Sequence, residues 1–339
     1  MKQVVLEQPG RFIASETAHP GKPKEGEALV KVRRLGICGT DLHAFRGKQP
    51  FFTYPRRLGH ELGVEVVEVG PKVTGLNAGE LCSVEPYLTC GKCIACRNGK
   101  TNCCMELKCL GVHTDGGMCE FITVPANKLH TSTKLSLEQL ALVETLGIGA
   151  HGVNRANVQR GEWALVLGAG PIGLAAIQFA KAAGAGVVVA DINLQRMKFC
   201  QEHLGVEYVI DATKDVLPQV ETICGKELAP AVFDCTGNQE SMQKAFQYVS
   251  HGGRLVFIGL GQFDITFNDP HFHRRELTVM SSRNSTGKEL KTIIEMIEQG
   301  KINTDPWITP RANFDRIVED FPAYLKPETG CIKAIIEVA

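Results

Sequence analysis

The stretch ALVLGAGPIGLAAIQ, residues 164–178, joins an apolar run to a helical pattern through a glycine-rich turn. Its glycines follow the spacing Gly168-x-Gly170-x-x-Gly173, with Pro171 and Ile172 between the last two. Between a strand and a helix, such glycines permit a tight turn, close approach of backbone to pyrophosphate, and close helix–strand packing. The free N–H groups at the start of the helix then attract phosphate. The stretch therefore predicts a dinucleotide-binding βαβ unit.

The next apolar run, GVVVAD, ends at Asp191, eighteen residues after Gly173. A carboxylate at this place can accept hydrogen bonds from the ribose hydroxyls and would repel a 2′-phosphate, which favours NAD over NADP. Arg196 weakens that preference, because a guanidinium suits a 2′-phosphate. A glycine-rich turn without a nucleotide is the alternative.

The patterns on either side predict the fold class. From residue 163 to about 260, apolar β-like runs alternate with helical patterns, as in a parallel sheet covered by helices. The first 140 residues instead contain short runs that alternate as half-buried strands do. We therefore expect an α/β protein with a mostly β domain and a doubly wound parallel sheet. The clearest single elements are strands at 27–37, 63–70 and 332–338 and helices within 136–158 and at 288–299.

Length and composition exclude several classes of protein. The 339 residues suggest two domains, and 44% hydrophobic with 22% charged residues is typical of a globular protein. The net charge is zero, without a long basic run, so we expect no nucleic-acid or membrane partner. The apolar residues 164–190 contain Pro171, Gln178 and Lys181, which argue against a membrane span. No signal peptide is evident, so we expect a cytoplasmic protein whose thirteen cysteines are ligands or buried thiols.

The segment CGKCIACRNGKTNCC, residues 90–104, contains five cysteines. Cys90, Cys93, Cys96 and Cys104 can close a tetrahedral zinc site, and a closed site is structural because it leaves no position for substrate. The ligand type also permits an iron–sulfur cluster, and a nucleic-acid ribbon would need a second cysteine knuckle and basic surface. The spacing alone leaves open whether Cys103 or Cys104 is the fourth ligand.

A second set of candidate ligands is spread along the chain. GICGTDLH, residues 36–43, contains Cys38, Thr40, Asp41 and His43; GHE contains His60 and Glu61; and LVETLG contains Glu144. One thiolate, one imidazole and carboxylates suit a zinc ion with an open position. These residues are far apart in sequence, and a lone cysteine or histidine is more often a packing residue.

Together, GICGTDLH, GHE, the cysteine segment and GAGPIG occur in an order that resembles the zinc-dependent medium-chain alcohol and polyol dehydrogenases. The resemblance covers essentially the whole chain. It implies a GroES-like catalytic domain formed by residues 1–145 and 285–339, and a Rossmann NAD-binding domain formed by residues 146–284.

The same resemblance implies the cofactors and the roles of site residues. The cofactors would be NAD and two zinc ions per chain. The catalytic zinc would be bound by Cys38, His60 and Glu61 or Glu144, and the structural zinc by Cys90, Cys93, Cys96 and Cys104. Thr40 and His43 would relay the hydroxyl proton, and Lys333 would lie against the pyrophosphate.

Several segments, among them RGKQPFFTYPRRLGHE, DCTGNQ, DPHFHRRE and SSRNST, resemble the sugar-acid branch of this family, the L-galactonate 5-dehydrogenase-like proteins. That branch implies oxidation of a secondary hydroxyl of a hexonate, such as L-galactonate or L-gulonate, to a keto acid. Candidate substrate residues are His113, Arg283 and Asn284. The basic residues Arg46, Lys48, Arg56 and Arg57 flank the ligand region and could bind a carboxylate, although such residues commonly face solvent.

Alternatives remain within and outside the family. A polyol of the sorbitol type, threonine or a small diol could be the substrate, and a non-enzymatic NAD-binding scaffold is disfavoured because Cys38, Thr40 and His60 are present. We expect a homo-oligomer, either a dimer or a tetramer. His271 and His273, two residues apart on a possible strand, are interpreted as an edge or subunit-contact feature.

Overall fold

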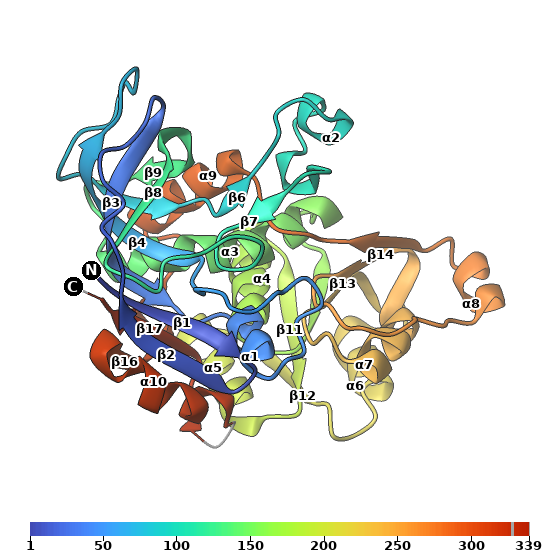
Figure 1. Ribbon diagram of the computed structural model, residues 1–339. Helices are drawn as coiled ribbons and strands as arrows, with labels where there is room; N and C mark the ends of the chain where they lie inside the picture. Colours follow the sequence, from blue (N-terminus) through green and yellow to red (C-terminus); the bar gives the residue numbers. More distant parts are fainter. Residues whose placement is uncertain (327–328, 339) are drawn as a thin grey trace. The chain divides into compact units, whose positions relative to one another are not determined.

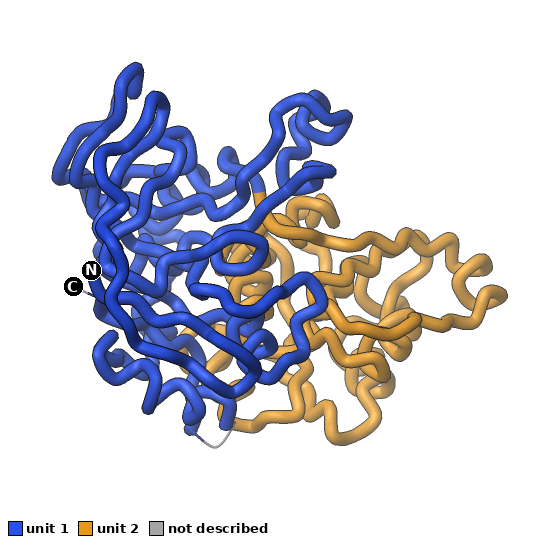
Figure 2. Tube along the Cα trace, in the orientation of Figure 1, with its two compact units in different colours: residues 1–144, 286–339 blue, residues 145–285 orange. Residues whose placement is uncertain are grey.

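The computed structural model describes residues 1–326 and 329–338. Contacts divide the chain into two compact units, residues 1–144 with 286–339 and residues 145–285 (Figure 2). The domain boundaries expected from the sequence, after residues 145 and 284, each differ by one residue from these limits. The expected first domain also includes residues 327, 328 and 339, which lie outside the described residues. We call the two parts unit 1 and unit 2 and describe each by itself.

Unit 1 is built on a seven-stranded sheet in its described part, with the order β16-β17-β3-β4-β5-β9 and with β8 paired to β3 (Figure 1). All pairs are antiparallel except β16 with β17. Side chains that alternate along β3 and β4 form one buried cluster, as the sequence pattern predicts. The strands are β3 (Glu27–Gly36), β4 (Glu61–Val69), β5 (Leu81–Val84), β8 (Phe121–Pro125), β9 (Leu129–Thr131), β16 (Ile308–Asn313) and β17 (Lys333–Glu337).

Shorter elements of unit 1 position the candidate ligands. Helix α1 (Gly39–Phe45) follows β3 directly, and helix α2 (Ile94–Arg97) lies in the cysteine segment between the short strands β6 (Tyr87–Leu88) and β7 (Lys108–Cys109). Helix α9 (Gly287–Glu298) begins at an N-terminal capping box between Thr286 and Glu289. Helix α3 (Leu137–Ala156) passes from unit 1 into unit 2.

Unit 2 contains a six-stranded parallel sheet in the order β12-β11-β10-β13-β14-β15. The strand order reverses next to β10, which is typical of a doubly wound sheet. The strands are β10 (Trp163–Leu167), β11 (Gly186–Asp191), β12 (Tyr208–Asp211), β13 (Ala229–Asp234), β14 (Val249–Phe257) and β15 (Thr278–Ser281); the helices between them are α4 (Pro171–Ala182), α5 (Leu194–Leu204), α6 (Leu217–Cys224), α7 (Gln239–Lys244) and α8 (Asp269–Arg274). The predicted α/β fold, with a mostly β part and a parallel sheet, is confirmed.

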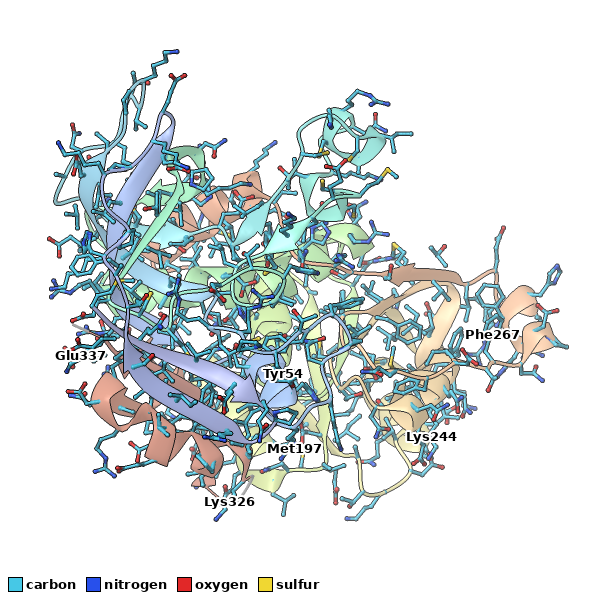
Figure 3. All side chains as sticks on the ribbon, viewed as in Figure 1. Tyr54, Met197, Lys244, Phe267, Lys326 and Glu337 are labelled. Atoms are coloured by element: carbon cyan, nitrogen blue, oxygen red, sulfur yellow. The ribbon has the colours of Figure 1, made fainter. Side chains whose placement is uncertain are left out.

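The expected strand around His271 and His273 is wrong, because these residues lie on helix α8. The Asn268 side chain accepts a hydrogen bond from the His271 N–H, and Pro270 stands in the first turn, where its missing N–H costs nothing. Phe267, labelled in Figure 3, precedes the helix, and its ring stacks on that of Phe246 with the centroids 4.9 Å apart. The signal for a helix was therefore present in the sequence NDP.

The apolar residues 164–190 fold as β10, the glycine-rich turn, α4 and β11, as expected for a βαβ unit. Across residues 1–326 and 329–338, helices of the length and hydropathy needed to cross a bilayer are absent. The thirteen cysteines, all of which are described, are free thiols.

An ion pair joins the start of β10 to β14 within unit 2. The Arg254 guanidinium donates to both carboxylate oxygens of Glu162, at 3.1 and 2.6 Å, and both side chains are 21% exposed. Although partial burial disfavours the charged carboxylate, the hydrogen bonds from Arg254 hold the pKa of Glu162 below its ordinary range.

We expect Glu162→Gln to lower the free energy of unfolding by about 1 kcal/mol at neutral pH. Because the folded-state pKa is depressed, this contribution is present above the unfolded-state pKa and is lost as the pH falls through the folded-state pKa. Urea denaturation of both proteins at neutral and acidic pH measures it. Glu240→Gln, which breaks the exposed pair with Lys244 on α7, is the control and should have little effect. A difference that grows in acid would contradict the assignment.

Candidate functional site

The first candidate ligand, Cys38, stands at the junction of β3 and α1. Its backbone N–H donates to Asp41 Oδ2 at 2.8 Å, which forms a capping interaction at the start of α1. This local bond fixes Cys38 at the beginning of the helix.

His60 and Glu61 come to the same place because β4 pairs with β3. Glu61 is the first residue of β4 and pairs with Gly36 of β3. Gly36 precedes Cys38 by two residues, so Glu61 lies near Cys38. The Cys38 sulfur, one ring nitrogen of His60 and one carboxylate oxygen of Glu61 all lie within 4.8 Å of one another. His60 and Glu61 are buried. The sheet thus brings together three of the four residues proposed for the catalytic metal.

Asp41, one of the polar residues of GICGTDLH, also belongs to this site. Its Oδ1 lies 3.8 Å from His60 Nδ1, and both atoms are buried without a hydrogen-bond partner in the described chain. A metal-bound histidine commonly directs its second ring N–H to a carboxylate, which fixes the tautomer and the ring orientation. We therefore infer that the Asp41 carboxylate orients the His60 ring. The signal was the spacing Cys-Gly-Thr-Asp, which places the capping carboxylate beside the ligand.

The electrostatics of the cluster favour a cation. Burial disfavours a charged ring, yet the neighbouring Asp41 and Cys38 raise the pKa of His60 well above its ordinary range. Burial raises the pKa of Asp41, and the nearby His60 opposes that rise. A thiol, an imidazole and a carboxylate together suit zinc, whereas calcium and magnesium prefer sets of oxygen ligands. The residues present therefore fit a zinc ion.

Glu144 lies on α3, near the cluster but outside the group of three. The Tyr87 hydroxyl donates to Glu144 Oε1. Burial raises the pKa of Glu144, and the charge of His60 acts against that rise. Either Glu61 or Glu144 can therefore supply the carboxylate ligand of the metal, and which of them does so stays a prediction.

Lys333, on β17, is 2% exposed. Its Nζ donates to Glu61 Oε1 at 2.5 Å, to Glu61 Oε2 at 2.6 Å and to the Ile37 carbonyl at 3.1 Å. These three bonds use all the donors of an ammonium group. The contact with a pyrophosphate that the resemblance implies stays a prediction, and the structure places Lys333 against a candidate metal ligand instead.

The other four candidate ligands gather on the loop around α2. The sulfur atoms of Cys90, Cys93, Cys96 and Cys104 lie within 4.8 Å of one another, whereas Cys103 is exposed and outside the group. The N–H of Cys96 and that of Met105 lower the pKa of Cys93 to about 6. The thiols therefore form a compact donor set of the kind that zinc requires.

The glycine motif forms the turn between β10 and α4. Gly168 has φ +92°, and a Cβ on Gly173 would lie 1.8 Å from the Gly168 carbonyl oxygen, so neither position tolerates a side chain. Gly170 is the N-cap of α4, and Pro171 follows in its first turn. Ile172 is half-buried in the same turn.

Asp191 and Arg196 lie beside this turn. Asp191 Oδ2 accepts from the Ala169 N–H and Oδ1 from the Asn193 N–H, at 2.5 and 2.7 Å. A carboxylate has further lone pairs, so Asp191 can still accept from a hydroxyl. A Cβ placed on Gly170 would lie 3.6 Å from Arg196 Nη1, so the guanidinium is next to this turn. The candidate nucleotide residues other than Lys333 thus converge at the carboxyl ends of β10 and β11.

The remaining site candidates divide between the units. Thr40 and His43 lie three residues apart on α1, on one face of the helix. The proton relay between them stays a prediction. His113, in unit 1, accepts the Cys109 N–H on Nδ1 at 3.1 Å and stacks with Phe51. Arg283 and Asn284 belong to unit 2. Asn284 has φ +53°, a conformation that asparagine tolerates, and the predicted substrate contacts of His113, Arg283 and Asn284 stay predictions.

The basic residues near the ligands are bonded to the protein itself. The Arg46 side chain donates to the Leu325 carbonyl, Arg56 to Asp115 and Thr53, and Arg57 to Gly116 O and Gln3. Each guanidinium keeps further donors, so the binding of a substrate carboxylate by these residues stays a prediction. Arg56 and Arg57 join the loop that follows α1 to the loop that follows β7, and Arg46 joins the end of α1 to Leu325.

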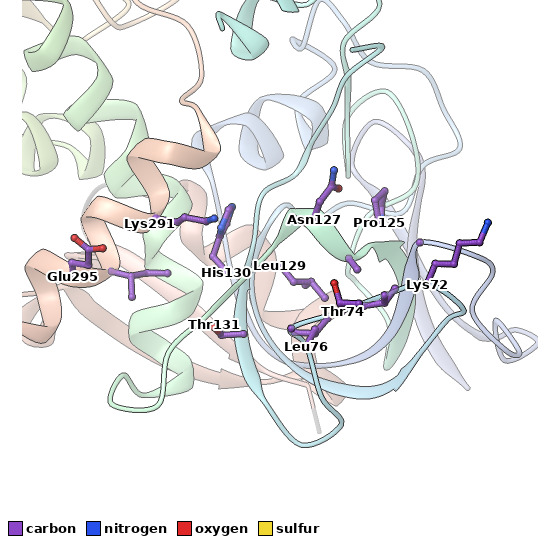
Figure 4. Close-up of a pocket in the computed structure, with 15 residues that line it drawn as sticks. Lys72, Thr74, Leu76, Pro125, Asn127, Leu129, His130, Thr131, Lys291 and Glu295 are labelled. Carbon is purple, nitrogen blue, oxygen red and sulfur yellow. The ribbon is translucent and has the colours of Figure 1, made fainter.

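A pocket of about 740 Å³ lies elsewhere in unit 1, lined mainly by α9, residues 72–76 and residues 125–131 (Figure 4). Lys72, Asn127, His130, Lys291 and Glu295 are among its lining residues. The pocket contains none of the candidate metal, nucleotide or substrate residues.

Comparisons with known proteins agree with this geometry. Residues 24–134 match the alcohol dehydrogenase GroES-like domain, and residues 171–299 match the zinc-binding dehydrogenase family. The chain is 39% identical to L-galactonate-5-dehydrogenase of Escherichia coli strain K12 over 99% of this chain and 98% of that protein.

Two solved structures share the fold over nearly the whole chain. One is an alcohol dehydrogenase from Escherichia coli CFT073 complexed with NADH, with a TM-score of 0.93, 28% identity and coverage of 100% and 99% of the two chains. The other is a zinc-binding dehydrogenase from Sinorhizobium meliloti 1021 bound to NADP, with a TM-score of 0.91, 28% identity and 99% coverage of both chains.

Proposed function

Since the chain belongs to the zinc-type medium-chain alcohol dehydrogenase family, we propose that it oxidises a secondary hydroxyl of a sugar acid to a ketone with NAD. The substrate would be a hexonate such as L-galactonate or L-gulonate. The observation that carries the substrate class is the full-length similarity to L-galactonate-5-dehydrogenase. The cluster of Cys38 with the buried His60 and Glu61 supports the zinc-dependent chemistry.

The chain's own residues would divide the work as follows. Cys38, His60 and a carboxylate, Glu61 or Glu144, would bind the catalytic zinc, while Asp41 orients His60. When bound, zinc supplies a Lewis acid that lowers the pKa of an alcohol, and NAD accepts the hydride. Thr40 would take the hydroxyl proton and His43, which is exposed on α1, would release it to solvent.

The nucleotide would bind on unit 2. The turn from Gly168 to Gly173 and the N-terminus of α4 suit the pyrophosphate, and Asp191 suits the ribose hydroxyls of NAD. Arg196 lies close enough to the same turn to permit some use of NADP. The thirteen free thiols support a reducing compartment such as the cytoplasm, and we expect a homo-oligomer.

The test is formation of NADH by the zinc-loaded protein with matched substrates: L-galactonate and L-gulonate, the corresponding hexitols, and L-threonine. We expect kcat/KM for one hexonate to exceed that for its hexitol by about tenfold or more, because a charged hydrogen bond to the carboxylate is available only to the acid. NAD should be preferred to NADP. Faster turnover of the hexitol or of threonine would contradict the sugar-acid assignment and favour one of the two alternatives within the family.

A further inference from the structure

The contact between Lys333 and Glu61 joins a buried cation to a candidate metal ligand. The two side chains are 2% and 1% exposed, and Nζ lies within hydrogen-bonding distance of both carboxylate oxygens. The Ile37 carbonyl accepts the third N–H of Lys333. Each donor of the ammonium group is therefore directed to Glu61 or to the backbone next to Cys38.

The sheet explains how this pair reaches across one strand. Gly36, on β3, pairs with Ile335 of β17 on one side and with Glu61 of β4 on the other. Lys333 stands two residues before Ile335, so their side chains lie on the same face of β17. A Cβ on Gly36 would lie 2.2 Å from Glu61 Oε2. The carboxylate of Glu61 therefore occupies the space that glycine leaves over β3, where Lys333 meets it.

Two partners compete for this one carboxylate. A Glu61 oxygen lies within 4.8 Å of the Cys38 sulfur and of a His60 ring nitrogen, so a metal bound there could reach it. Lys333 donates to both oxygens of the same carboxylate. A zinc ion with four protein ligands has no position for substrate, whereas one with three protein ligands has such a position.

We propose that Lys333 is a positioning residue that holds Glu61 back from the metal and so keeps one coordination position open for the substrate alcohol. The inference rests on the zinc site of the proposed function. It assigns Glu61 to the ion pair with Lys333 in the resting site and leaves Glu144 as the carboxylate available to the metal.

The test is Lys333→Met, which keeps the length of the side chain and removes its charge. We expect Glu61 to join the metal, so the zinc affinity, measured by competition with a chromogenic chelator, rises on the order of tenfold. In the cobalt-substituted protein the ligand-field absorption should weaken as the coordination number increases, and kcat should fall. Unchanged zinc affinity and an unchanged cobalt spectrum would overturn the proposal.

A double-mutant cycle separates ligation from charge. If Lys333 acts through Glu61, Lys333→Met has no effect on zinc affinity when Glu61 is already Gln; an effect of the same size in that background would show a through-space charge effect and overturn the proposal. Lys128→Met is the matched control. Lys128 forms a largely buried ion pair with Glu85 in unit 1, and neither residue belongs to the two clusters of candidate metal ligands. Removing the Lys128 charge should therefore leave the zinc affinity unchanged.

Lys333→Met leaves an uncompensated buried carboxylate and could fail to fold. The double variant Lys333→Met with Glu61→Gln removes both charges and should fold, with zinc affinity within about twofold of the natural protein. A tenfold or larger loss would show that Glu61 is already a ligand and would overturn the proposal. Failure of the zinc assignment itself looks different, because then the natural protein would bind no zinc that depends on Cys38.

Discussion

Replacing Cys38 by alanine is expected to abolish alcohol oxidation while leaving the fold intact. Cys38 is the thiol of the cluster that also contains the buried His60 and Glu61. Its backbone N–H donates to Asp41, and the substitution leaves this bond in place. Loss of a Lewis acid removes several kcal/mol of transition-state stabilisation, so kcat/KM should fall by at least about a thousandfold. Elemental analysis should show the zinc content fall from about two to about one per chain.

Cys109→Ala is the matched control for this experiment. Cys109 lies close enough to Cys38, His60 and Glu144 for their charges to affect it, but burial raises the pKa of its thiol to about 12, so it stays protonated. A protonated thiol is a poor metal ligand. The control should keep its zinc and retain activity within about threefold, since the thiol is small. Equal loss of metal from both variants would show that Cys38 has no special role.

The parts of the fold that follow from local spacing were predictable. The alternation along residues 27–37 and 63–70 reflects one buried face, and those runs form β3 and β4. The glycine spacing at Gly168, Gly170 and Gly173 corresponds to a turn that excludes side chains. In each case the physical constraint acts over a few neighbouring residues, so a short quotation of the sequence contains it.

The contacts that depend on strand pairing were not predictable in the same way. Lys333 and Glu61 are far apart in sequence, and only the order β17-β3-β4 with a glycine between them brings the charges together. The spacing of Asp41 from Cys38 was visible, but its proximity to His60 also requires the pairing of β3 with β4. The candidate ligands Cys38, His60 and Glu61 can therefore be brought together only by the pairing of strands. The four cysteines of residues 90–104 lie close in sequence, so their spacing alone reveals them.

Replacing Cys104 by alanine is expected to release the loop of residues 90–104 from its folded form. Helix α2 has no buried residue, and Ile94 and Met105 are 61% and 77% exposed, so apolar burial contributes little there. A metal bound by four thiolates can supply that missing stabilisation. Hydrogen exchange of the loop amides should become at least about a hundredfold faster, and zinc content should fall to about one per chain.

Cys103→Ala is the control, because Cys103 adjoins Cys104 but is exposed and outside the group of four. It should keep both its zinc content and its exchange rates. The strands β3 and β4 should stay protected in both variants, since their side chains lie in a separate buried cluster. If the loop stays protected without Cys104, then its own hydrogen bonds suffice to fold it, and the structural role of the metal is wrong. If instead Cys103→Ala loses the metal, then Cys103 is the fourth ligand, and the closeness of Cys104 to the other three thiols does not reflect metal binding.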